Sequence, residues 1–98
     1  MFSKILKTNR NFSFINFKDD YDVNCNIQIS SANKKHIWLG TEKPNPRILS
    51  CKLTPGTTGW CEYPLPNDVL VDHKMHLTQH QSFRLALRLI KFAILGKL

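Results

Sequence analysis

The sequence predicts an α+β fold, in which a small antiparallel sheet of about four to five strands packs against one C-terminal helix. Two observations support this prediction. Residues 23–30 alternate apolar and polar side chains with a period of two, as half-buried strands do, and residues 79–95 carry apolar side chains at helical spacing. A chain of 98 residues with 42% apolar and 21% charged residues suits one small domain and excludes wholesale disorder. We expect a single domain over 1–98, with residues 1–11 as a basic segment that is free to move.

The first half of the chain predicts three strands. Residues 12–17 are rich in aromatic and β-branched side chains, and the polar cluster 18–22 is typical of a turn. Residues 12–17 and 23–30 are therefore expected to form a β-hairpin. The apolar run 36–39, closed by Gly40, predicts a third strand or strand end.

Proline and glycine interrupt the middle of the chain. The prolines within 44–46 force an extended, irregular connection, because each fixes its own φ and disfavours helix in the residue before it. Residues 48–53 are a candidate strand, and residues 60–63 are expected to pair back with it across the turn at 54–59. Residues 68–77 are expected to form a final extended segment.

The C-terminal segment predicts a helix over 79–95. Thr78 and Gln81 fit a capping box, and Gly96 suits the left-handed residue that follows a helix. Apolar side chains cover roughly two thirds of the circumference, so we expect this helix to cover one face of the sheet, and an apolar surface this wide also suits a homodimer seam. The remaining narrow sector is a basic stripe, formed by Arg84, Arg88 and Lys91.

The net charge of +7 is unevenly distributed. Residues 1–18 and 73–98 carry cations and no acid, whereas all seven acids lie within 19–72. If the two ends lie together, they form one positive face suited to phosphate, an anionic nucleotide or an acidic protein surface; the alternative is a solvated basic surface. The candidate ligand- or partner-binding residues are Arg84, Arg88, Lys91, Lys34 and Lys35.

Catalysis has no support in the sequence, and we expect no enzyme activity, cofactor or metal. His73, His76 and His80 invite a zinc hypothesis, but they straddle a predicted strand–helix junction and lack a ligand spacing, which favours ordinary surface histidines. The glycines match no phosphate-binding loop.

The three cysteines show no CxxC spacing, which favours reduced thiols and a cytoplasmic protein. No signal peptide or membrane span is expected.

Nucleic-acid binding is the second hypothesis. Lys34, Lys35 and His36 precede Trp38, and further aromatic side chains could stack on bases. The alternative is that the aromatic residues form the core, since no known nucleic-acid-binding signature is present. The other aromatic candidates are Phe12, Phe14, Phe17 and Tyr21.

Several short motifs resemble a family of small proteins from bacterial and phage genomes that has no established activity. They are Ile37-Trp38-Leu39-Gly40, Thr58-Gly59-Trp60 with Tyr63-Pro64-x-Pro66-x-Asp68-Val69, Met75-His76-Leu77, and the spacing of Gln81, Leu85, Leu89, Phe92, Gly96 and Leu98. This chain has Asp22 where the family has glycine, and its last helix is less acidic. The resemblance implies a phage-associated accessory or counter-defence role. The expected function is a small non-catalytic binding protein for a protein partner or an anionic ligand, and the alternative is a nucleic-acid-binding module.

Overall fold

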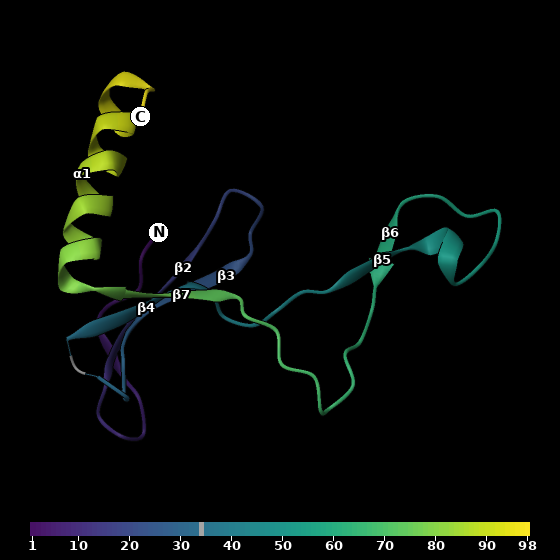
Figure 1. Cartoon of the computed structure of the whole chain (residues 1–98), viewed down its shortest axis with the longest axis horizontal. Helices are drawn as coiled ribbons and strands as arrows, with labels where there is room; N and C mark the ends of the chain where they lie inside the picture. The colour runs from purple at the N-terminus through teal and green to yellow at the C-terminus, as the bar shows by residue number, and fades with distance from the viewer. Residues whose placement is uncertain (34) are drawn as a thin grey trace. The chain divides into compact units, whose positions relative to one another are not determined.

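The computed structural model describes residues 1–33 and 35–98, which form two compact units. The larger unit comprises Met1–Glu42 and Lys74–Leu98, and the smaller unit comprises Lys43–His73. The larger unit is an antiparallel sheet joined to one helix (Figure 1). The predicted α+β class is confirmed.

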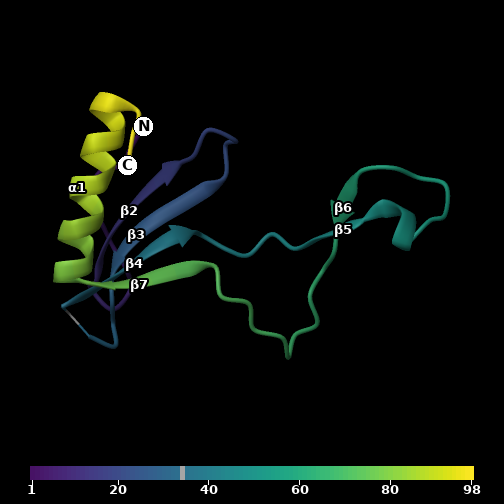
Figure 2. The same ribbon diagram turned by 45° about the horizontal axis from the view of Figure 1, so that its top comes forward.

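The sheet of the larger unit has five strands in the order β1-β2-β3-β4-β7, and all neighbours are antiparallel. Figure 2 shows β2, β3, β4 and β7 side by side in this order. The strands are β1 (Leu6–Lys7), β2 (Ser13–Lys18), β3 (Asn24–Ile29), β4 (His36–Thr41) and β7 (Lys74–Thr78). The predicted hairpin is β2–β3, and the predicted third strand is the inner strand β4. The final strand is shorter than the expected segment 68–77 and begins at Lys74.

The turn between β2 and β3 is built by an acidic side chain. One Asp19 carboxylate oxygen accepts hydrogen bonds from the backbone N–H groups of Tyr21 and Val23, at 2.8 and 3.0 Å. Asp22 follows with φ +62°, in the left-handed region that glycine adopts at least cost. The expected turn is confirmed, and its geometry explains why glycine suits position 22.

The two faces of the sheet differ in chemistry because opposed residues of an antiparallel pair share a face. Ile15, Ile27, Leu39 and Met75 form one row across β2, β3, β4 and β7 and make one face apolar. The adjacent row, on the other face, is Phe14, Gln28, Trp38 and His76. The second face is therefore polar and aromatic.

The helix α1 (Gln79–Leu95) begins directly after β7, with no connecting residue. The Thr78 hydroxyl accepts from the Gln81 backbone N–H at 3.0 Å, and the Gln81 side chain accepts from the Thr78 N–H at 3.0 Å. Gly96 ends the helix with φ +69°, and its N–H donates to the Phe92 carbonyl. The predicted bounds, capping box and glycine cap are all confirmed.

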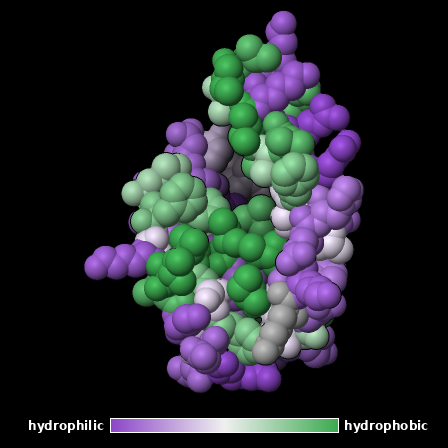
Figure 3. Space-filling model, turned by 90° about the vertical axis from the view of Figure 1, so that its left-hand side faces the viewer, coloured by the Kyte–Doolittle hydropathy of each residue, from purple (hydrophilic) through white to green (hydrophobic). Residues whose placement is uncertain are grey.

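The helix packs against the sheet as predicted, but contrary to the expectation from the sequence it leaves most of its wide apolar surface exposed. Its first turns meet the apolar face of the sheet, where Gln79 and Ser82 line a depression with residues of β3, β4 and β7. Most of its large apolar side chains are about half exposed. Figure 3 shows hydrophobic side chains in the centre of this view, continuing toward α1 at the top. Among the described residues, Cys25 is the only apolar residue classed as buried, at 8% exposure.

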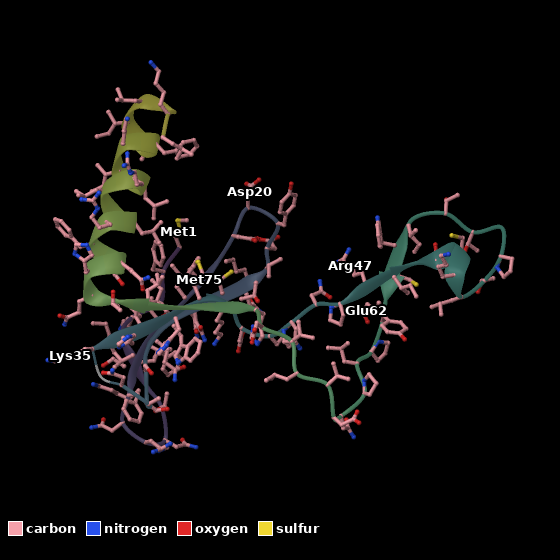
Figure 4. All side chains as sticks on the ribbon, in the orientation of Figure 1. Met1, Asp20, Lys35, Arg47, Glu62 and Met75 are labelled. Carbon is pink, nitrogen blue, oxygen red and sulfur yellow. The ribbon has the colours of Figure 1, made fainter. Side chains whose placement is uncertain are left out.

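The smaller unit contains a short antiparallel pair, β5 (Arg47–Leu49) and β6 (Trp60–Glu62), which confirms that residues 60–63 pair back. The pair places Arg47 opposite Glu62 (Figure 4). The expected strand 48–53 is too long, because the chain enters a 3₁₀ turn at Ser50–Lys52. Ser50 closes the loop there by donating its hydroxyl to the Thr58 and Gly59 carbonyls, at 2.7 and 3.0 Å.

Across the described part of the chain, no helix is long and apolar enough to cross a membrane.

Candidate functional site

The basic stripe of α1 is the candidate binding site. Arg84, Arg88 and Lys91 lie at i, i+4 and i+7, which places them on one side of a helix with 3.6 residues per turn. They line one shallow depression of about 240 Å³ together with the apolar Leu87. The depression therefore combines three cations with an apolar contact.

The positive charges of the basic stripe are not balanced by acidic residues in the same segment of the chain. Residues 73–98 contain no acid, and α1 has no acidic residue in its first turn. The Arg88 guanidinium donates from Nη1 to the Leu98 carbonyl at 3.4 Å, a long hydrogen bond that leaves most of its N–H donors to solvent. Guanidinium groups bind carboxylates and phosphates through paired hydrogen bonds, so these donors suit an anionic group.

Lys35 is not part of this stripe, although the sequence groups it with the helix cations. It precedes β4, whose first residue His36 pairs with Thr78 at the start of α1, and Figure 4 shows Lys35 at that end of the sheet. It lines a different depression, with Gln79 and Ser82. Ser82 and Arg84 point about 160° apart around a helix, so Lys35 and the stripe lie on different sides of it. Lys34, the fifth predicted residue, lies outside the described residues.

The N-terminal cations begin at the far edge of the sheet. Lys7 lies on β1 at one edge, and β7, which leads into α1, forms the opposite edge, with three strands between them. Its ammonium group donates to the Ser13 hydroxyl at 2.8 Å. Lys7 is therefore separated from β7 by the width of the sheet, and the candidate site is formed by residues of α1 alone.

A second candidate site lies on the polar face of the sheet. The Trp38 and His76 rings stack with centroids 4.1 Å apart, and the His36 and His76 rings with centroids 4.8 Å apart. His76 Nε2 lies 3.0 Å from the hydroxyl of Ser30, which is fully buried. Position in the sequence did not reveal this cluster, because it depends on the pairing of β4 with the distant strand β7.

Amide side chains surround the aromatic cluster. Asn16, Asn24, Asn26 and Gln28 share this face, since they alternate with the apolar residues of β2 and β3. Asn26 is only 7% exposed, and its side-chain oxygen has no hydrogen-bond partner in the described part of the molecule. A buried acceptor of this kind is costly to leave unpaired, so it marks the face as a place where a donor could bind.

The remaining aromatic candidates lie elsewhere. Phe17 is on the apolar face, where its ring contacts Phe2 with centroids 5.1 Å apart. Tyr21 is exposed in the β2–β3 turn, and Phe12 precedes β2 beneath the Arg10 guanidinium, 5.7 Å from it. Phe14 alone among the four shares the face of Trp38.

The histidines do not form a metal site in the part of the chain that the structure describes, where no group of three or more potential ligands is brought together. His76 stacks on the sheet and His80 lies on α1. The thiols are also separate, since Cys25 is buried, Cys51 is exposed and Cys61 is half-buried, and all three are free.

Comparison of the chain with protein-family models, curated proteins and solved structures found no match.

Proposed function

We propose that this protein is a small, non-catalytic cytoplasmic binding protein that holds an anionic partner against the basic stripe of α1. The observation that carries the proposal is the shared depression of Arg84, Arg88, Lys91 and Leu87. Guanidinium groups would bind carboxylates or phosphates, and Leu87 would contact an adjacent apolar group. The resemblance alone motivates a phage-associated accessory or counter-defence role, which we retain as part of the proposal.

An acidic protein surface is the partner that this depression suits best. Three cations on an exposed helix attract any polyanion, but an apolar residue among them favours a partner that presents side chains as well as charge. The depression is lined only by exposed side chains of one helix, which suits a surface contact better than enclosure of a small molecule.

The test compares two variants with the same change in net charge. The stripe variant replaces Arg84, Arg88 and Lys91 by glutamine, and the control variant replaces Lys4, Lys7 and Arg10 by glutamine. Fluorescence anisotropy measures binding to a labelled ten-residue peptide of glutamate and leucine at low salt. We expect the stripe variant to lose at least about tenfold in affinity, while the control variant retains its affinity. Equal losses in both variants would show that net charge alone drives binding and would contradict the proposal.

The second candidate function is a nucleic-acid-binding module that uses the polar face of the sheet. The stacked rings of Trp38 and His76, with the unpartnered oxygen of Asn26, support it, because single-stranded nucleic acids bind to aromatic platforms edged by polar groups. This face carries few cations: Lys18 and Lys74 lie on it at the ends of β2 and β7.

Substitution of Trp38 separates the two candidates. Binding of labelled oligodeoxythymidine through the sheet should weaken by roughly 0.7 log units per log unit of salt for each phosphate contacted, and Trp38→Ala should cost roughly 1–3 kcal/mol. Binding through α1 should be unchanged in Trp38→Ala. A Trp38→Ala variant that binds the oligonucleotide as tightly as the parent would exclude the sheet as the platform.

A further inference from the structure

The side of α1 that faces away from the sheet carries a second set of apolar residues with a regular spacing. Ser82 and Leu85 are half-buried on the sheet side. About 140–180° around the helix from Leu85 lies the outer stripe, which we define as four residues at i, i+4, i+7 and i+11. They are Phe83, Leu87, Ile90 and Ile94, and each is between 47% and 74% exposed.

The spacing of the outer stripe is that of a coiled-coil seam. Steps of four, three and four residues are the alternation of the a and d positions in a heptad, and they keep one narrow line of apolar side chains facing a partner helix. On one flank of this line lie the small residues Ala86 and Ala93, and on the other lie Arg84 and Lys91. Small flanking residues allow two helices to approach closely.

We propose that the outer stripe is a homodimer seam, in which α1 packs in parallel against α1 of a second copy of this chain. In a parallel pair, the flank with Arg84 and Lys91 faces the alanine flank of the other helix, so no like charges meet. In an antiparallel pair, Arg84 of one copy would lie near Lys91 of the other and would repel it. The second copy supplies a matching apolar line, so the seam needs no acidic partner.

The exposed area is enough for a weak dimer. At roughly 200 Å² for a fully exposed large apolar residue, four residues that are about 60% exposed present on the order of 500 Å² per copy. Two copies therefore bury about 1,000 Å², which is near the lower limit for a specific interface and typical of reversible association. The first turns of α1 remain against their own sheet in this arrangement.

Charge gives this dimer a salt dependence opposite to that of the anion site. Each copy carries a net charge of +7, and the basic stripes flank the seam. Salt screens this repulsion, so raising the salt concentration should tighten the dimer, whereas it should weaken anion binding to the stripe. Leu87 belongs to both surfaces, so the two kinds of binding are distinguished by their opposite responses to salt.

Sedimentation equilibrium on the full chain, at two salt concentrations, measures the association. We expect a reversible dimer in the micromolar range that tightens at the higher salt concentration. Ile90→Gln should weaken it at least about tenfold, because it places a polar amide in the seam. The matched control is Leu89→Gln, since Leu89 is equally exposed at 55% but lies outside the outer stripe, and it should leave the dimer unchanged. Circular dichroism checks that both variants keep the helix.

Orientation is tested with a cysteine at the end of the seam. Ile94→Cys, combined with Cys51→Ser and Cys61→Ser, should form a disulfide-linked dimer on mild oxidation, because a parallel pair places the two copies of this residue next to each other. A dimer that does not cross-link at this position would overturn the parallel arrangement. A monomer at both salt concentrations, or equal weakening by Ile90→Gln and Leu89→Gln, would overturn the seam.

Discussion

Thr78 is both the last residue of β7 and the N-cap of α1, so its hydroxyl is the most direct place to perturb the joint between sheet and helix. Thr78→Val keeps the shape and the β-branched side chain but removes the acceptor of the 3.0 Å bond from the Gln81 N–H. Loss of an N-cap acceptor costs about 1 kcal/mol, within a range of roughly 0.5–2 kcal/mol. We therefore expect Thr78→Val to lower the free energy of unfolding by about 1 kcal/mol.

The assay is urea unfolding followed by circular dichroism at the helical band. With a slope of roughly 1–2 kcal/mol per molar urea, the midpoint should fall by about 0.5–1 M. Thr78→Ser is the matched control, because it retains the capping oxygen and should keep most of the parental stability. Equal midpoints for the valine and serine variants would refute the reasoning, since they would show that the hydroxyl does not stabilise the helix.

Two further substitutions and one labelling experiment test particular backbone and burial features. Gly96→Ala should lower the free energy of unfolding by about 1 kcal/mol in the same urea titration, because φ +69° strains any residue with a Cβ; an unchanged midpoint would contradict the left-handed cap. Asp22→Gly should raise it by about 0.5 kcal/mol, since relief of strain at φ +62° outweighs the added flexibility of the unfolded chain; a destabilised variant would indicate that the Asp22 side chain matters more than its backbone. In thiol labelling of the native protein, exposed Cys51 should react first and buried Cys25 last, and simultaneous reaction of the two would contradict the described burial.

Local patterns in the sequence predicted the elements whose stabilising contacts are local. The alternation over 23–30 produced β3, and the Thr78–Gln81 pair with Gly96 fixed both ends of α1, because capping depends on residues within one turn. The strand expected over 48–53 was too long because its end depends on contacts between residues that are not close in the sequence. Its end is set by bonds from Ser50 to a segment eight and nine residues away, which no periodicity shows.

The candidate site was predictable only in part. Helical spacing placed Arg84, Arg88 and Lys91 together, and the structure gives them one depression. Lys35 could not be assigned to a side of α1 from the sequence, because its position depends on how β4 pairs with β7. The stacking of Trp38 on His76 depends on the same pairing. Exposure of the apolar surface of α1 also depends on tertiary packing and was not visible in the pattern of residues.

The pairing of β4 with β7 brackets the 31 residues of the smaller unit. Five cross-strand pairs with β4 hold β7 in register. Residues 43–73 connect these two strands but do not determine how they pair. The entropic cost of closing such a loop grows only slowly with its length. Residues 43–73 should therefore tolerate cleavage of the backbone, a deletion or the insertion of another domain. It is thus a natural point for fragment complementation, with one fragment supplying the first four strands and the other supplying the edge strand and the helix.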